Sequence, residues 1–221
     1  MTPGTCRAED SLASWLRIRP EIPWPAWRGT RSGSGAPGGD GLRDFFTATR
    51  GRRDSEGTAR VLAAIDVVFA DARQGVPLSF ALLAGWQRTV LGRQCVGFRP
   101  APAFAKGGQE RYGLAADTRT RFERCLSEST QADLPLPARA ARAYLDVLFF
   151  HPFEDGNARA AMLALAFLLA REGVFLRDAR PVAVMRWADD AEGAADLAVL
   201  LGILTTAAER HRTQGAPDTG G

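Results

Sequence analysis

One nine-residue segment concentrates the side chains that could do chemistry, and it reads HPFEDGNAR over residues 151–159. His151 is the only residue in it whose pKa suits proton transfer at neutral pH. Asp155 offers the hard carboxylate oxygen that Mg²⁺ prefers. The next three residues lie where we expect a helix to begin, so their backbone N–H groups would form an anion site: Gly156, Asn157 and Ala158. A base, a metal carboxylate and an oxyanion site together predict phosphoryl-group transfer.

Arg159 falls in the first turn of the expected helix, where a cation is unfavourable for the helix dipole. An anionic ligand held by the planar guanidinium would explain this position. The Asp-Gly-Asn sequence also suits a simple capping turn, but a capping turn accounts for neither His151 nor Arg159. Phe153 has no polar task, and we expect it to point inward and fix the loop to the core.

The elements that must position this segment are mostly helical. Apolar spacing predicts helices over residues 12–16, 42–49, 58–73, 118–127, 138–150, 157–172 and 192–211, and another between Ser79 and Gly92. Residues 95–113 contain β-branched and aromatic residues, two prolines and the pair Gly107-Gly108, a pattern typical of a short hairpin. The sequence therefore predicts an all-α bundle with one small β-hairpin.

Composition excludes several classes of protein. The chain has 221 residues, 46% of them hydrophobic, and a net charge of +3. Its arginines are scattered, so we expect no nucleic-acid partner. Three separated cysteines without a CxxC spacing, and only two histidines, argue against a zinc site. The longest apolar run, 160–170, is too short for a membrane span, and the first residues do not resemble a signal peptide, so we expect a cytoplasmic protein without membrane association.

The HPFEDGNAR segment resembles the signature loop of Fic-domain (Fic/Doc) proteins, HPFx(D/E)GNGRxxR. Every fixed position through the first arginine matches, except that Ala158 replaces glycine. The resemblance implies a Fic-type helical bundle with a β-hairpin flap, which transfers AMP from ATP to a hydroxyl group of a target protein. With it we expect a catalytic domain over 42–212; composition predicts an N-terminal extension over 1–41 with a flexible Gly/Ser/Pro-rich segment and a disordered tail over 213–221.

The resemblance also implies a role for each residue. His151 would deprotonate the acceptor hydroxyl, and Asp155 would hold Mg²⁺ against the nucleotide phosphates. The Gly156, Asn157 and Ala158 backbone would stabilise the transferred phosphate, while Arg159 would grip the β-phosphate. The flap would align the target segment through five residues: Phe104, Ala105, Lys106, Gly107 and Gly108. Lys106 at the flap tip is either a solvated charge or a contact. Arg99, upstream of the flap, would face the nucleotide side of the cleft.

Two positions depart from the family pattern. Ala158 adds a Cβ beside the expected anion site. Met162 stands where the family has its second arginine, which grips the γ-phosphate. Three interpretations stay open: transfer from ATP with a weaker hold on its γ-phosphate, a Fic-type reaction with a CDP-linked donor or a small-metabolite acceptor, or a catalytically silent nucleotide-binding module. The chain contains no (S/T)xxxE(G/N) inhibitory motif.

Overall fold

The computed structural model describes residues 10–26, 41–50, 54–176 and 178–214. Its strands are β1 (Ala103–Ala105) and β2 (Glu110–Tyr112), which pair antiparallel with Phe104 opposite Arg111. Helices make up most of the rest: α1 (Ser11–Ile18), α2 (Gly41–Arg50), α3 (Ser55–Gln74), α4 (Phe80–Leu91), α5 (Thr118–Glu128), α6 (Leu136–Phe150), α7 (Asn157–Arg171) and α8 (Ala191–Gln214). The prediction of a helical bundle with one small hairpin is confirmed.

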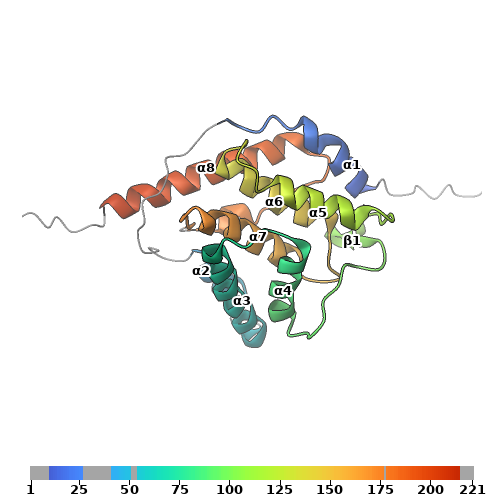
Figure 1. Ribbon diagram of the computed structural model, residues 1–221, viewed down its shortest axis with the longest axis horizontal. Helices are drawn as coiled ribbons and strands as arrows, with labels where there is room; N and C mark the ends of the chain where they lie inside the picture. Colours follow the sequence, from blue (N-terminus) through green and yellow to red (C-terminus); the bar gives the residue numbers. More distant parts are fainter. Residues whose placement is uncertain (1–9, 27–40, 51–53, 177, 215–221) are drawn as a thin grey trace, which may run out of the picture.

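Helices α6 and α7 form the centre of the bundle (Figure 1). Residues 160–169 of α7 are all buried, so this helix is apolar on every side, as a fully enclosed helix must be. It packs against α6 on one side and against α3 and α4 on another. In turn, α6 packs against α1, α5 and α8. The loop between the two central helices is therefore anchored at both ends by the core.

Local signals explain where the helices begin and end. The Ser79 side chain accepts a hydrogen bond of 3.2 Å from the Leu82 N–H, and Gly92 ends α4 in the left-handed conformation. Helix α6 begins at Leu136, ahead of the predicted residue 138, because Pro137 lies in its first turn, where proline has no hydrogen bond to lose. The hairpin strands occupy only part of the predicted segment 95–113. Pro100 and Pro102 have no backbone N–H to donate to a neighbouring strand, so the first strand begins only at Ala103.

Helix α1 is tied to the core by a buried ion pair. Asp146 of α6 is fully buried and accepts hydrogen bonds from Trp15 Nε1 at 3.0 Å and from Arg19 Nε at 2.7 Å. The expected flexible segment 29–41 and the tail 213–221 lie almost wholly outside the described residues. Among the residues described, no helix has the length and apolar character that a membrane crossing requires.

Candidate active site

His151 ends α6 and begins the loop that leads to α7. Its backbone is in the left-handed region, with φ 49°, and its N–H caps α6 by donating to the Val147 carbonyl at 3.2 Å. Non-glycine residues rarely adopt this conformation, and they do so more often at functional sites than elsewhere. This conformation ends the helix at His151, so its imidazole lies at the start of the loop and not along the side of α6.

The His151 imidazole is held on two sides. Its Nδ1 lies 3.0 Å from the Leu148 carbonyl oxygen, and its ring stacks on Tyr112 with centroids 4.8 Å apart and planes 13° from parallel. Burial lowers the pKa of His151 below 6.5; the nearby Arg99 and Lys106 act in the same direction, while the Leu148 hydrogen bond and Glu110 oppose it. The ring is therefore neutral at neutral pH.

The loop is fixed from within by Asn157 and Phe153. The Asn157 side chain accepts from the Phe153 N–H at 2.9 Å and donates to the Phe153 carbonyl at 2.8 Å, and it is almost fully buried. Phe153 is fully buried, as predicted, and stacks on Phe80 of α4 with centroids 5.5 Å apart. The Asn157 side chain thus shapes the loop, and only its backbone N–H remains as a group for an anion.

Gly156 turns the chain into α7. Its φ is +78°, and a Cβ placed there would come within 2.4 Å of Gln87 Nε2. Glycine has no side chain with which to cap the helix, and no side-chain hydrogen bond from this position caps α7. Ala158, in the same first turn, is exposed. A helix N-terminus with an exposed residue in its first turn is the kind of position where proteins bind anions.

Gln87 of α4 supports this turn, and the sequence analysis did not identify it as a functional residue. Its side chain is fully buried and donates a hydrogen bond of 2.7 Å from Nε2 to the Asp155 carbonyl. Its Oε1 is buried without a hydrogen-bond partner. A single glutamine inside an apolar helix was the only available signal, because its partner lies 68 residues further along the chain.

Asp155 and Arg159 pair with each other across the turn. Arg159 donates to the Asp155 carboxylate at 3.1 Å; the Arg159 side chain is 16% exposed and that of Asp155 is 63% exposed. The guanidinium folds back over Gly156, where it would be 2.9 Å from an added Cβ. In the described part of the chain, no three His, Cys, Asp or Glu residues cluster as a metal site. Asp155 is therefore an accessible carboxylate beside a cation.

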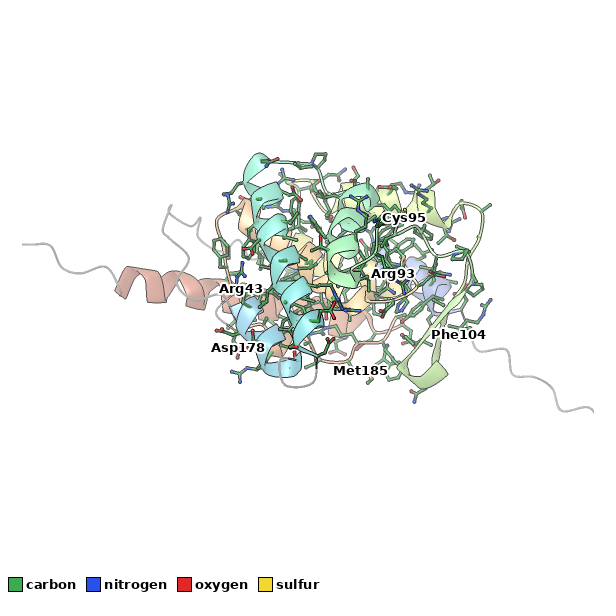
Figure 2. All side chains as sticks on the ribbon, turned by 90° about the horizontal axis from the view of Figure 1, so that it is seen from below. Arg43, Arg93, Cys95, Phe104, Asp178 and Met185 are labelled. Atoms are coloured by element: carbon green, nitrogen blue, oxygen red, sulfur yellow. The ribbon has the colours of Figure 1, made fainter. Side chains whose placement is uncertain are left out.

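The flap lies next to His151. Tyr112, at the end of β2, supplies the ring on which the imidazole stacks. Phe104 points outward from β1 and is 61% exposed (Figure 2). The backbone of Lys106 and Gly107 at the tip is left-handed, and Gly108 also has a positive φ of 89°.

Lys106 is not a solvated charge, because its ammonium group makes contacts within the protein. Its ammonium group donates to Glu110 at 2.6 Å and to the Arg186 carbonyl, and it lies 4.1 Å from the centroid of the Trp187 ring. Only 14% of its side chain is exposed. Lys106 therefore holds the flap tip against the segment that precedes α8.

Arg99 joins the flap to the loop. Its guanidinium donates to the Gly113 carbonyl at 2.5 Å and to the Phe150 carbonyl at 3.4 Å. The backbone N–H of Arg99 donates to the Pro152 carbonyl at 2.9 Å. It is 3% exposed, and burial lowers its pKa. The expectation that Arg99 faces a nucleotide is wrong, because carbonyl groups of the protein already surround it.

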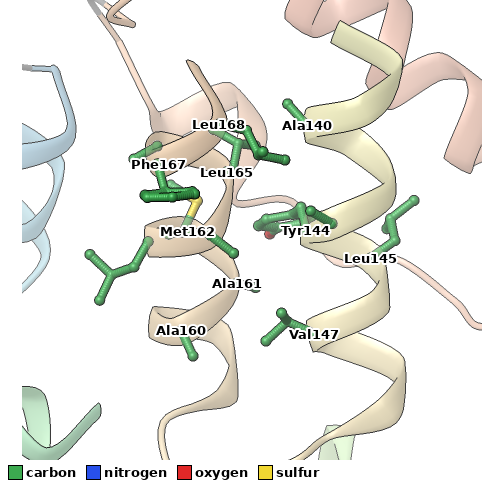
Figure 3. Close-up of a cluster of buried hydrophobic side chains, with 14 of the residues drawn as sticks. Ala140, Tyr144, Leu145, Val147, Ala160, Ala161, Met162, Leu165, Phe167 and Leu168 are labelled. Atoms are coloured by element: carbon green, nitrogen blue, oxygen red, sulfur yellow. The ribbon is translucent and has the colours of Figure 1, made fainter. Parts of the chain in front are cut away.

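Met162 lies among the buried side chains of α7 (Figure 3). It is 3% exposed, and its neighbours in this cluster are apolar residues of α7 and α6. Position 162 therefore offers no positive side chain to a ligand.

Comparison with known proteins agrees with this geometry. Residues 77–169, which run from just before α4 almost to the end of α7, match the Fic/DOC family, so the expected resemblance to this family is confirmed over this segment. A Fic-domain protein from Bacteroides thetaiotaomicron is 20% identical, with a TM-score of 0.53 over 77% of this chain and 76% of that one. No curated protein is a significant match in sequence.

Two further solved structures have the same fold. A histidine-to-alanine variant of IbpAFic2, solved in complex with adenylylated Cdc42, is 13% identical, with a TM-score of 0.56 over 87% of this chain and 69% of that one. Fic-1 from C. elegans is 15% identical, with a TM-score of 0.52 over 95% of this chain and 73% of that one. These likenesses establish a Fic-type fold for the chain.

Proposed function

We propose that this protein is a Fic-type transferase that moves AMP from ATP onto a hydroxyl group, with His151 as the general base. The observation that carries the proposal is the 3.0 Å contact between His151 Nδ1 and the Leu148 carbonyl oxygen. A carbonyl oxygen only accepts hydrogen bonds, so Nδ1 carries the proton and Nε2 keeps the lone pair that a base needs. The family match over residues 77–169 includes this loop and supports the same class of reaction.

In the transfer step, the acceptor hydroxyl gives its proton to His151 Nε2 while its oxygen forms a bond to the α-phosphorus. The bond from the α-phosphorus to the oxygen that bridges to the β-phosphate breaks, and pyrophosphate leaves with that electron pair. Because burial holds the pKa of His151 below 6.5, the imidazole is unprotonated at neutral pH and can accept the proton.

The beginning of α7 would bind the phosphates. Its first N–H groups, set by the left-handed Gly156, and the positive end of the helix dipole favour negative charge there. Arg159 would exchange its contact with Asp155 for one with a phosphate oxygen, since phosphate and carboxylate both suit its planar guanidinium. These donors would stabilise charge that grows on the phosphate as the bond breaks.

Mg²⁺, which the family implies, fits the residues present. Asp155 is a single exposed carboxylate, and Mg²⁺ commonly takes one or two carboxylates and fills its remaining positions with phosphate oxygens and water. When bound, the ion would neutralise part of the phosphate charge. Asp155 would hold it, and Arg159, now paired to the same carboxylate, would be released toward the nucleotide.

We propose that the acceptor hydroxyl belongs to a protein. In the described residues, β1 is hydrogen-bonded to β2 alone, so its other edge has no strand partner and can pair with an extended segment. IbpAFic2, which shares this fold, was solved in complex with adenylylated Cdc42, a protein acceptor. A small hydroxylated metabolite is the alternative acceptor.

Met162 favours one alternative donor. With a buried methionine at the position of the family's γ-phosphate arginine, nothing from this turn of α7 selects for a third phosphate. A diphosphate-linked donor such as CDP-choline would lose no contact here. A module that binds nucleotides without transferring them is the alternative outside the enzymes.

The test compares donors and histidine variants. The protein is incubated with Mg²⁺, a cell extract as a source of acceptors, and either ATP labelled at its α-phosphate or CDP-choline labelled in its phosphocholine. We expect transfer from ATP that is lost in His151→Ala and kept in His211→Ala, the chain's other histidine. Label from CDP-choline instead would overturn AMP transfer. Nucleotide binding without any transfer would overturn the enzyme proposal.

A further inference from the structure

Beside His151 the flap carries a buried carboxylate that the proposed reaction does not use. Glu110 of β2 is 4% exposed. Its Oε1 accepts from the Ala188 N–H at 2.9 Å, while its Oε2 accepts from Lys106 at 2.6 Å and from the Tyr112 hydroxyl. A buried carboxylate is stable only when charged and polar partners surround it, and all of these partners are present.

Tyr112 connects this carboxylate to the base. It lies two residues after Glu110, so both side chains are on the same, inner face of β2. Burial and the neighbouring carboxylate raise the pKa of the Tyr112 phenol far above its ordinary value, so the hydroxyl stays a donor to Glu110. With its hydroxyl fixed, the 2% exposed ring presents one face to the imidazole at 4.8 Å.

We propose that Glu110 is a positioning residue for His151, acting through Tyr112, and that Lys106 holds the Glu110 carboxylate in place. The proposal rests on the proposed function only in that it takes His151 as the base. Two contacts define the imidazole plane: the Leu148 carbonyl holds Nδ1, and the Tyr112 ring covers one face. Without the second contact the ring can turn about its Nδ1 hydrogen bond and move Nε2 away from the acceptor.

The competing explanation is that Glu110 only fastens the flap to the segment before α8. Its bond to Ala188, and the contacts of Lys106 with Arg186 and Trp187, would suit that role. Under that explanation a Glu110 variant lowers stability but leaves the His151 ring as it was. The environment of the imidazole therefore separates the two explanations.

The experiment observes His151 directly by NMR. The chain has two histidines, so the signals of His151 are identified by their absence in His151→Ala. We expect the Cε1–H signal of His151 to lose its ring-current shift in Tyr112→Leu. In Tyr112→Phe and Glu110→Gln the shift should be partly lost, since a ring remains without its anchor. Val90→Ala, a buried change in α4, is the matched control for lost stability and should leave the signal in place.

The pH titration of the same signal gives a second readout. Arg99, Lys106 and Glu110 are the charged groups that act on His151, and Glu110 alone favours its protonated form. Glu110→Gln should therefore move the midpoint of the titration to lower pH. Tyr112→Phe, which keeps Glu110, should move it less. An unchanged His151 signal and midpoint in Glu110→Gln would overturn the proposal.

Transfer kinetics complete the test. We expect Glu110→Gln to lower kcat by about tenfold to a hundredfold, with KM for the nucleotide unchanged, because displacement of a base by a fraction of an ångström costs rate and not nucleotide binding. Tyr112→Phe should lower kcat about as much as Glu110→Gln, because both variants remove the anchor of the ring, and Tyr112→Leu, which also removes the ring, should lower it further. If the unaltered protein transfers nothing, the proposed function fails and the NMR results still decide the positioning of His151.

Discussion

The Gln87 side chain donates a hydrogen bond of 2.7 Å to the main-chain carbonyl of Asp155, and this bond joins α4 to the turn that begins α7. Gln87 is fully buried, and the Asp155 carbonyl is the last one before Gly156. We infer that this bond to α4 fixes the position of the turn relative to the core. The bond adds to the stacking of Phe153 on Phe80, so α4 contacts the loop at two points.

Replacing Gln87 with leucine should therefore weaken both stability and phosphate binding. The Asp155 carbonyl would lose its partner, at a cost of about 1–3 kcal/mol in the free energy of unfolding. Urea denaturation measures the first effect, and titration with ATP measures the second. Gln74→Leu, at the exposed end of α3, is the control and should change neither. Equal denaturation midpoints for the two variants would contradict this role of Gln87.

Two glycines of the chain should respond to alanine in opposite ways. Gly156→Ala places a Cβ within 2.4 Å of Gln87 Nε2 at a φ of +78°, so we expect a loss of about 1–3 kcal/mol and weaker anion binding. Gly85→Ala, inside α4, meets nothing closer than 3.8 Å and should raise stability by up to about 1 kcal/mol. Melting temperatures of both variants show whether stability falls or rises in each. A higher melting temperature for Gly156→Ala would mean that neither the positive φ nor Gln87 constrains the turn.

The main features of the fold could be predicted because they depend on local patterns. Apolar periodicity and the caps at Ser79 and Gly92 placed α4 nearly to the residue. The loop between α6 and α7 could also be recognised, because its candidate functional residues are neighbours in the sequence, between residues 151 and 159. Gln87, Glu110 and Tyr112 could not be found that way, because each gains its role from a partner brought near only by folding. The contacts of Lys106 with Arg186 and Trp187 likewise join residues about 80 positions apart.

Stability should depend on pH through His151. Its pKa is lowered in the folded protein, mainly by burial, whereas in the unfolded chain it is near 6.5. As the pH falls below about 6.5 the unfolded chain binds the proton first, so the free energy of unfolding declines until the pH passes the folded pKa. Melting temperatures of the unaltered protein and of His151→Gln, measured from pH 8 to pH 5, test this. We expect the shallower decline in His151→Gln, and equal slopes would contradict a lowered pKa.

Restoring the family arginine at position 162 should not restore a γ-phosphate contact. Met162 is 3% exposed within the apolar cluster of α6 and α7, so Met162→Arg must bring a guanidinium into the core or distort α7 to let it out. We expect a loss of about 2–4 kcal/mol in stability and no gain in ATP affinity. Met162→Leu, of similar volume, should cost less than about 1.5 kcal/mol. A stable Met162→Arg protein with tighter ATP binding would show that the arginine reaches the cleft.

The buried pair of Arg19 and Asp146 predicts that residues 10–26 are part of the stable fold. Asp146 is fully buried, and Arg19 donates to both of its oxygens, at 2.7 and 2.9 Å. Arg19→Met would leave that carboxylate with the Trp15 N–H, and breaking a buried pair from one side costs about 3–5 kcal/mol. Arg17→Met, on the exposed side of α1, is the matched control and should lie within about 0.5 kcal/mol of the unaltered protein. Urea denaturation followed by tryptophan fluorescence measures both. If Arg19→Met unfolds at the same urea concentration as Arg17→Met, α1 does not depend on this pair for its attachment to α6.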